Sequence, residues 1–207
     1  YTGFYALPIL TSRGCNYKCK FCVDRLAICQ GTYRERSISR VLKEVIHLYE
    51  RYNIKGLYFC DSSLNASLPR LTSLCDGLTN VKKETGNAIN WGGDIRASPL
   101  TKEILKSMYN AGCRYLMFGA ESASDKILKA MGKGVTIRNM TKAFAWAKEA
   151  GIWVFTYWMV GYPGEKEEDL LDSIRFVQEN CSNIDEACVA PCEVGVGSAL
   201  YCMRKEL

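Results

Sequence analysis

Short apolar runs alternate with amphipathic stretches along the chain from residue 7 onward. Apolar runs of strand length, each followed by a segment of helical period, predict repeated strand–helix units and a parallel sheet. Such runs predict six strands, over residues 7–12, 56–60, 88–95, 115–118, 152–160 and 187–190. Between them, apolar residues recur at helical spacing over 41–52, 104–109 and 170–177, each opposite a polar face. We therefore expect an α/β fold.

Proline and glycine mark the ends of the predicted helices. Ser98-Pro99 predicts a helix start, because proline is tolerated in the first turn. Ala111-Gly112 and Ala150-Gly151 predict helix ends, because glycine readily adopts the left-handed cap conformation. Six right-handed strand–helix units curve into a barrel or an arc of one. The sequence thus predicts a TIM-like barrel of parallel strands, or an arc of one, formed as a single domain over residues 1–207.

Polar residues follow the predicted strands at the point where each strand ends. In barrels of this kind the loops at the carboxyl ends share one face, and the active site is built on that face. The polar segments are a cysteine-containing loop, Asp61-Ser62-Ser63, Asp94 with Arg96, Glu121-Ser122 and the turn 161–165. Any one of these residues can be a plain helix cap. Five such segments on one rim favour a functional site there.

The first of these loops, residues 14–23, carries a C-x3-C-x2-C triad and is called the cysteine loop below. The triad consists of Cys15, Cys19 and Cys22. Three thiolates can hold an iron–sulfur cluster, and a four-iron cluster held by three of them keeps one iron open to another ligand. Lys18 and Lys20 are expected to keep the loop solvated and its thiols ionised. The alternatives are a zinc site with Cys29 as fourth ligand, or small buried residues without metal.

Composition narrows the remaining possibilities. The chain has 207 residues, of which 48% are hydrophobic, enough for one substantial core. Its net charge of +5 is spread without a basic run, so nucleic acid is not indicated. The apolar runs are shorter than a membrane span, and with no secretory signal the eleven cysteines predict reduced thiols in the cytoplasm. Because it starts at Tyr1 and stops without a capping signal, we expect a domain from a longer chain.

The cysteine triad, with aromatic Phe21 just before its last cysteine, resembles the signature of the radical S-adenosylmethionine (radical SAM) enzymes. Segments 118–122, 127–134 and 159–165 are similar to the subgroup that contains cobalamin-dependent enzymes and methylthiotransferases. The resemblance implies a partial (β/α)6 barrel, a 4Fe–4S cluster on the three cysteines and SAM on the open iron. Such enzymes cleave SAM reductively to methionine and a 5′-deoxyadenosyl radical, which abstracts hydrogen from a substrate, while the protein supplies placement.

The same resemblance implies which residues contact SAM. Phe21 would lie against the adenine, and Glu121 with Ser122 would contact the polar part of SAM. Lys133 would pair with the SAM carboxylate in a charge-assisted contact, the alternative being a solvated lysine at a helix end. Arg96 and Tyr157, at strand ends, are further candidates.

One segment departs from the family pattern. Many members carry Gly-Gly-Glu after the second strand, where this chain has Cys60-Asp61-Ser62-Ser63. Asp61 would then either take over the contact to the SAM ammonium or only cap a helix. Of the other cysteines, Cys188 is expected in the core as a small hydrophobe, whereas Cys192 follows a strand end and is the one to face a substrate.

The resemblance leaves two enzyme interpretations. The first is the core of a cobalamin-dependent methyltransferase or related rearrangement enzyme, with cobalamin bound by a domain before Tyr1. The second is a methylthiotransferase, which needs further cluster cysteines upstream and a recognition module downstream. A zinc-binding scaffold is the non-catalytic alternative. The expected partners are a small-molecule or peptide substrate and a reductant such as flavodoxin or ferredoxin, with neither nucleic acid nor membrane indicated.

Overall fold

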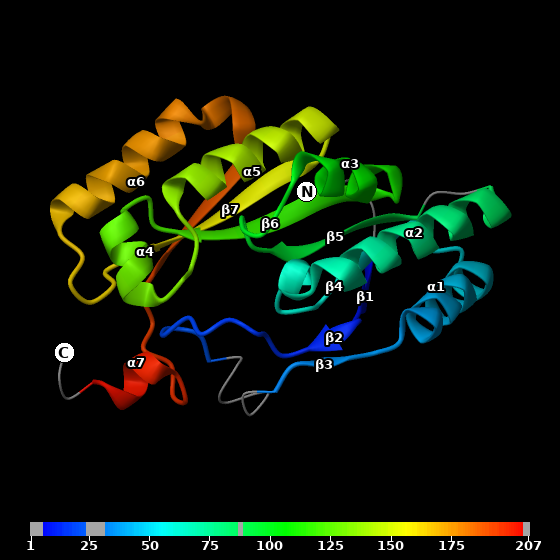
Figure 1. Ribbon diagram of the computed structural model, residues 1–207, viewed down its shortest axis with the longest axis horizontal. Helices are drawn as coiled ribbons and strands as arrows, with labels where there is room; N and C mark the ends of the chain where they lie inside the picture. Colours follow the sequence, from blue (N-terminus) through cyan, green and yellow to red (C-terminus); the bar gives the residue numbers. More distant parts are fainter. Residues whose placement is uncertain (1–5, 24–31, 87–88, 205–207) are drawn as a thin grey trace.

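The computed structural model describes residues 6–23, 32–86 and 89–204 (Figure 1). The strands are β1 (Ala6–Ile9), β2 (Ser12–Arg13), β3 (Arg34–Glu35), β4 (Gly56–Phe59), β5 (Asn90–Ile95), β6 (Cys113–Glu121), β7 (Trp153–Val160) and β8 (Glu186–Pro191). The helices are α1 (Ile38–Tyr52), α2 (Leu68–Thr85), α3 (Lys102–Asn110), α4 (Asp125–Met131), α5 (Ile137–Ala150), α6 (Glu167–Glu179) and α7 (Ala199–Cys202), with 3-10 turns η2 (Leu64–Ala66) and η3 (Cys181–Asn183). None of the helices in these described ranges has the length and apolar character needed to cross a membrane.

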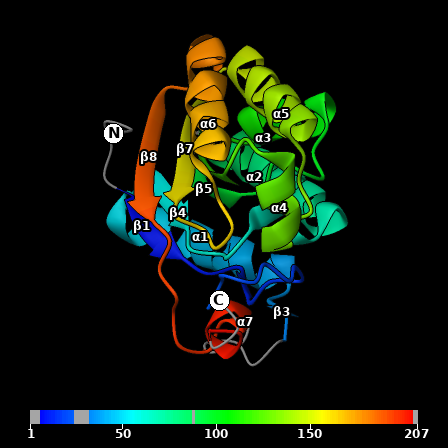
Figure 2. The same ribbon diagram turned by 90° about the vertical axis from the view of Figure 1, so that its left-hand side faces the viewer.

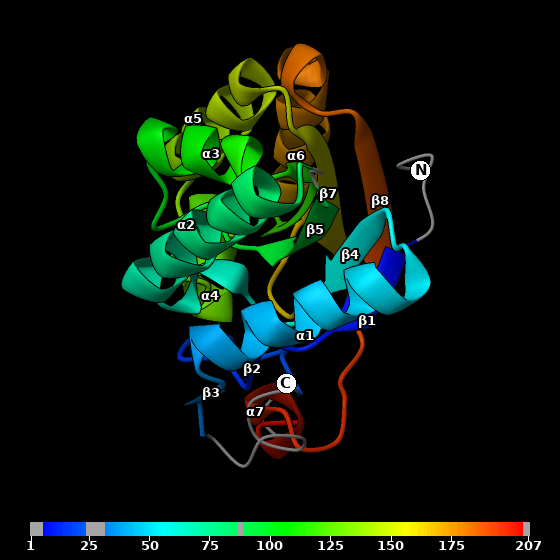
Figure 3. The ribbon, with the colours of Figure 1, turned by 90° about the vertical axis from the view of Figure 1, so that its right-hand side faces the viewer.

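Six strands form one sheet in the order β1-β4-β5-β6-β7-β8, and every neighbouring pair is parallel. Figures 2 and 3 show this sheet as a curved layer, with α2, α3, α5 and α6 along its outer side. Strands β2 and β3 lie outside the sheet as a separate antiparallel pair. The prediction of an α/β fold with a partial barrel of parallel strands is confirmed.

Several predicted boundaries differ from those observed. The predicted strand 7–12 is divided, because β1 ends at Ile9 and Ser12 pairs with β3 instead of the sheet. The predicted strand 88–95 is seen from Asn90, and residue 88 lies outside the described residues. The third helix begins at Lys102 instead of at Ser98-Pro99, because the Thr101 side chain caps it by accepting a hydrogen bond from the Ile104 amide.

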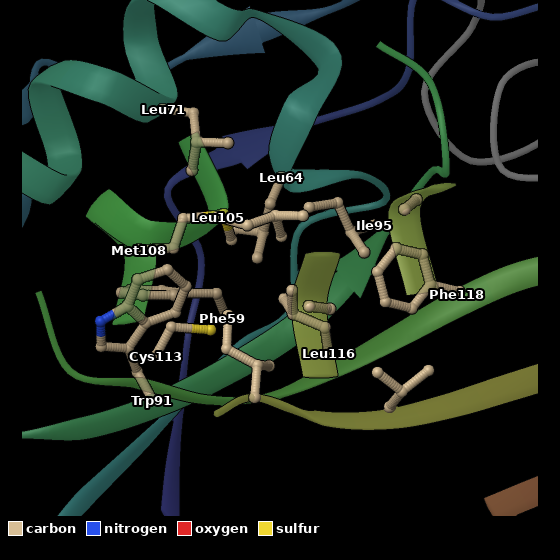
Figure 4. Packing of buried hydrophobic residues seen from close by; sticks show 14 of the residues in the cluster. Phe59, Leu64, Leu71, Trp91, Ile95, Leu105, Met108, Cys113, Leu116 and Phe118 are labelled. Atoms are coloured by element: carbon tan, nitrogen blue, oxygen red, sulfur yellow. The ribbon is translucent and has the colours of Figure 1, made fainter. Parts of the chain in front are cut away.

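The main core lies between the sheet and the outer helices. Alternate strand residues point to this side, among them Phe59, Trp91, Leu116 and Phe118, all fully buried (Figure 4). The Trp91 indole nitrogen donates to the Ala111 carbonyl at 2.9 Å, so this ring is packed in the core and satisfied there. Burial of each such side chain contributes about 1.5–3 kcal/mol.

Strand β8 is an edge of the sheet, and its residues are exposed along its whole length. Cys188 lies on this strand and is exposed, so the expectation that it is a core residue is wrong. Because an edge strand has only one neighbour and helix α6 does not cover it fully, burial of a small apolar residue there does not follow from the strand pattern alone.

Asp169 connects the start of α6 to the start of α4. Its Oδ1 accepts a hydrogen bond from the Ser124 hydroxyl at 2.7 Å. Its Oδ2 accepts from the Lys126 ammonium at 2.6 Å and from the Lys166 amide at 3.0 Å. These bonds, the one from Lys126 first, lower the pKa of Asp169 to about 2. The loop between β6 and α4 is therefore held to α6 by one carboxylate.

Replacing this carboxylate should make the protein less stable in a pH-dependent way. A lowered pKa in the folded state means that Asp169 stabilises the fold above the ordinary pKa of 3.8, and that this stability is lost as the pH falls toward about 2. We expect Asp169→Asn to lower the Tm by several degrees at pH 7 and the difference from wild type to shrink below pH 4. Thermal unfolding followed by circular dichroism measures this. A Tm difference that does not change between pH 7 and pH 3 would contradict it.

Candidate functional site

A cavity of about 240 Å³ lies at the carboxyl ends of the parallel strands. Its lining comes from the cysteine loop, from the segments after β4, β5 and α4, and from β6 and β7. The residues are Cys15, Cys19, Phe21, Cys22, Ser62, Asp94, Ile95, Arg96, Met117, Gly119, Glu121, Lys133 and Tyr157. Of the residues that the sequence names as cluster ligands or SAM contacts, the cavity brings together all except Asp61 and Ser122. Ser63, the turn 161–165 and Cys192, which the sequence also placed on this rim, do not line it.

The cysteine loop is fixed from several sides. The Lys20 amide donates to the Met131 carbonyl at the end of α4, and the Leu200 amide of α7 donates to the Lys20 carbonyl, both at 2.8 Å. On the opposite side the Asn16 side-chain amide donates to the Ala66 carbonyl of η2 at 3.1 Å. The position of the three thiols is therefore set by the protein scaffold.

Asp61 holds the chain where it leaves β1 and enters this loop. Its carboxylate is buried and accepts hydrogen bonds from the Thr11 amide at 2.7 Å, the Thr11 hydroxyl at 2.5 Å and the Ser12 hydroxyl at 2.6 Å. Both oxygens are engaged. Asp61 therefore neither caps a helix nor reaches the cavity, and the structure does not bring it to the predicted contact with a ligand.

Arg96 connects the cysteines to the far side of the cavity. The buried guanidinium donates from Nη1 to Cys19 Sγ at 3.4 Å and from Nη2 to the Lys133 carbonyl, and it lies 3.7 Å from the centroid of the Tyr17 ring. Within residues 6–23, 32–86 and 89–204, its Nε is buried without a hydrogen-bond partner. The guanidinium therefore brings a buried positive charge next to the thiols.

Burial, more than charge, controls the Cys15 thiol. Desolvation raises the pKa of Cys15, and a backbone hydrogen bond at Tyr17 and the nearby Arg96 charge offset only part of that rise. Lys18 is exposed to solvent and does not contribute. Burial therefore opposes ionisation of Cys15 in the metal-free protein, and the structure does not support the expectation that the loop lysines keep this thiol ionised. A metal that binds the thiolate favours its ionisation.

Glu121 and Lys133 form a buried ion pair at the rim. Lys133 Nζ lies 2.6 Å from Glu121 Oε1, and the two side chains are only 7% and 12% exposed. The alternative of a solvated lysine is wrong. Gly119 makes room for the pair, because a Cβ there would lie 2.7 Å from both Glu121 Oε1 and Lys133 Nζ. An ammonium has three donors, so Lys133 can bind Glu121 and a second anion together.

Phe21 and Ser122, two further candidates from the sequence, differ in whether they reach the cavity. Phe21 lines the cavity, packs against the small cluster that includes Met131 and Leu200, and has its ring centroid 5.6 Å from Lys133 Nζ. Ser122 is fully buried behind the rim, where its hydroxyl accepts a hydrogen bond from the Ser124 amide at 3.1 Å. Ser122 therefore shapes the loop and does not line the cavity.

The structure adds Tyr58 and Met117 to the residues considered from the sequence. Tyr58 donates from its hydroxyl to Oδ2 of Asp94 in the cavity wall at 2.6 Å, and Tyr157 donates to Met117 Sδ at 3.2 Å. Burial raises the pKa of Asp94, and the hydrogen bond from Tyr58 offsets part of this rise. The period of two along each strand is the signal that could have placed these side chains on the inner face.

The geometry of the cysteines can be tested against the two metal sites considered from the sequence, a zinc site and a four-iron cluster. In the described part of the chain, no three His, Cys, Asp or Glu residues are close enough to share one metal ion. A four-iron cluster does not need such convergence, because each thiolate binds a different iron. Three thiols on one loop with a buried guanidinium beside them fit such a cluster. The proposed fourth zinc ligand, Cys29, lies outside the described residues.

Comparison with known proteins identifies the family. A model of the radical SAM superfamily matches residues 9–177, so the chain belongs to that superfamily. An uncharacterised methyltransferase of Pyrococcus horikoshii is 31% identical over 171 residues, covering 83% of this chain and 36% of that protein. A tRNA-2-methylthio-N(6)-dimethylallyladenosine synthase of Syntrophobacter fumaroxidans is 28% identical over 185 residues, covering 86% and 40%. The chain thus spans well under half the length of these relatives.

Solved structures show the same fold. The radical SAM methyltransferase TsrM from Kitasatospora setae, determined with cobalamin and a 4Fe–4S cluster bound, superimposes with a TM-score of 0.81 at 20% identity, over 92% of this chain and 35% of TsrM. The cobalamin-dependent radical SAM enzyme OxsB, determined with aqua-cobalamin and SAM bound, gives a TM-score of 0.72 at 24% identity, over 97% of this chain and 29% of OxsB.

The buried ion pair gives a prediction about stability. Lys133→Ala leaves the Glu121 carboxylate buried without its partner, which we expect to cost about 3 kcal/mol of unfolding free energy. Urea unfolding of the metal-free protein measures this. Lys129→Ala, which removes an exposed lysine from the last turn of α4, is the control and should change stability by about 0.5 kcal/mol or less. The double variant Glu121→Gln/Lys133→Met should regain most of the loss, and equal effects of the two lysine variants would contradict the burial argument.

Proposed function

We propose that this chain is the catalytic core of a radical SAM enzyme that carries a 4Fe–4S cluster on Cys15, Cys19 and Cys22. The observation that supports this most directly is the shared cavity. It places three thiols on a braced loop opposite a buried ion pair at the carboxyl ends of the strands. When bound, the cluster and SAM supply the reductive cleavage of SAM to methionine and a 5′-deoxyadenosyl radical, which abstracts hydrogen from a substrate.

The charged residues of the rim bind and orient SAM. Lys133 keeps one donor on Glu121 and offers the others to the SAM carboxylate. Glu121 Oε2 accepts from the SAM ammonium or a ribose hydroxyl, a charge-assisted contact. Arg96 keeps Cys19 oriented and brings a positive charge beside the anionic cluster. Phe21, already packed on one side, offers an apolar face to the adenine.

Side chains from β6 and β7 line the side of the cavity that lies away from the charged rim. Met117 and Tyr157 line the cavity, and the Tyr157 hydroxyl donates a hydrogen bond to Met117 Sδ. We propose that Tyr157 lies between SAM and the substrate, a more specific position than a general SAM contact.

The whole reaction that we propose is cobalamin-dependent methyl transfer or a related rearrangement, with cobalamin bound by another part of the protein. The motifs in 118–122 and 159–165, the methyltransferase relative and the similarity of fold to TsrM and OxsB support this. Methylthiotransfer is the second candidate, because a tRNA methylthiotransferase matches over 86% of the chain. We further propose a small-molecule or peptide substrate, a reductant such as flavodoxin or ferredoxin, and a reducing cytoplasmic setting.

The cluster assignment predicts the metal content of cysteine variants. After anaerobic reconstitution with iron and sulfide, the wild-type protein should be brown and hold about four irons per chain. Cys15→Ala, Cys19→Ala and Cys22→Ala should each lose most of that iron and its visible absorbance. Cys181→Ala, at an exposed cysteine in η3, is the matched control and should reconstitute normally. A colourless protein that retains tightly bound zinc would overturn the assignment.

The reaction class predicts the products formed from SAM. Incubation of the full-length reconstituted protein with SAM and a reductant should give S-adenosylhomocysteine only when cobalamin is present, which mass spectrometry detects. Formation of 5′-deoxyadenosine alone, with no S-adenosylhomocysteine even when cobalamin is present, would contradict the methyltransferase assignment. Transfer of sulfur together with a methyl group to RNA or protein would favour methylthiotransfer instead.

A further inference from the structure

The cavity has a second polar end that the binding of SAM does not use. Tyr58, Asp94, Tyr115 and Tyr157 come from four adjacent strands, β4 to β7. The Tyr58 hydroxyl donates a hydrogen bond to Asp94 Oδ2 at 2.6 Å, and both Asp94 and Tyr157 line the cavity. Desolvation raises the pKa of Tyr115 to about 12, and the charges of Tyr157, Glu186 and Asp94 add to this rise.

Aromatic rings form a continuous wall beside Asp94. The Phe155 ring lies 6.3 Å from that of Tyr115 and 4.8 Å from that of Tyr157, measured between centroids. Asp94 is opposite Met117 across the β5–β6 pair, and Met117 is opposite Phe155 across β6–β7. The carboxylate therefore faces an inner surface in which aromatic and thioether groups predominate.

The charge of Asp94 is not balanced by the protein. Across residues 6–23, 32–86 and 89–204 Asp94 forms no ion pair, and its carboxylate accepts a hydrogen bond from the neutral Tyr58 hydroxyl. The nearest cations of the cavity are otherwise engaged, since Arg96 donates to Cys19 and the Lys133 carbonyl, and Lys133 to Glu121. A largely desolvated carboxylate without a cation is costly, and a bound cation offsets that cost.

We propose that Asp94, held by Tyr58, binds a cationic nitrogen of the substrate, whose apolar or aromatic body lies against Tyr115, Phe155 and Tyr157. The carboxylate supplies a charge-assisted hydrogen bond, and the faces of the rings attract the same cation. The inference rests on the proposed function, because it names the substrate class of the same cavity. It makes Asp94 the residue that determines specificity and Tyr58 a positioning residue.

A pair of probes with the same ring and opposite charge tests this. Isothermal titration calorimetry on the full-length reconstituted protein should show that tyramine binds and that 3-(4-hydroxyphenyl)propionate does not. Asp94→Asn, which is nearly isosteric, should weaken tyramine binding at least tenfold, and Tyr58→Phe should weaken it a few fold. Asp172→Asn, an exposed carboxylate on α6, is the control and should leave tyramine binding unchanged.

Binding of SAM separates this site from the SAM site. We expect the SAM affinity of Asp94→Asn to stay within about twofold of wild type. An equal loss of SAM and tyramine binding would overturn the proposal, because Asp94 would then belong to the SAM site. Lack of any preference for the amine in wild type, or its persistence in Asp94→Asn, would also overturn it.

The two proposals can fail separately. If wild type cleaves SAM but shows no preference for tyramine that depends on Asp94, only the inference about the substrate fails. If wild type shows that preference but forms no product from SAM after the cluster is confirmed, the inference stands and the proposed function fails. Circular dichroism of Asp94→Asn and Tyr58→Phe establishes that both are folded before binding is compared.

Discussion

The common direction of the six sheet strands is the constraint on which the site depends. Since every neighbouring pair is parallel, every carboxyl end lies at the same edge of the curved sheet. The cysteine loop follows the first of these strands, and Arg96 and Glu121 stand at the ends of two others. Residues more than a hundred positions apart along the chain therefore meet without any special connection. Curvature of the sheet then turns the shared edge into a cavity.

Within that cavity, charges are fixed before any ligand arrives. Arg96 reaches both Cys19 and the Lys133 carbonyl, and Lys133 pairs with Glu121, so one series of contacts crosses from the thiols to the rim. Asp61 fixes the start of the cysteine loop with its two oxygens. Preorganised charge of this kind needs little rearrangement when a charged cofactor binds, which is how a protein stabilises and orients a reactive group.

Features that depend on local patterns could be predicted from the sequence, and those that depend on distant pairs could not. The strands and the cysteine triad follow from periodicity and spacing within short segments. Asp61 and its partner Thr11 are 50 positions apart, so nothing local distinguishes a carboxylate that anchors a loop from one that binds a ligand. Asp94 shows an intermediate case. The alternation along β5 places it on the inner face, but its bond to Tyr58 depends on a register in which Tyr58 is opposite Gly92.

If Asp94 binds the substrate as we propose, the two ends of the cavity also restrict where on the substrate the reaction occurs. Asp94 is level with Met117 on the neighbouring strand, whereas the charged atoms of the Glu121–Lys133 pair lie beside Gly119, two residues further along that strand. At about 3.3 Å per residue, these levels are roughly 7 Å apart. A substrate anchored by its nitrogen at Asp94 would therefore present an atom several bonds away to the region of SAM. The separation between the two sites thus selects for substrates whose reacting atom is remote from the charge.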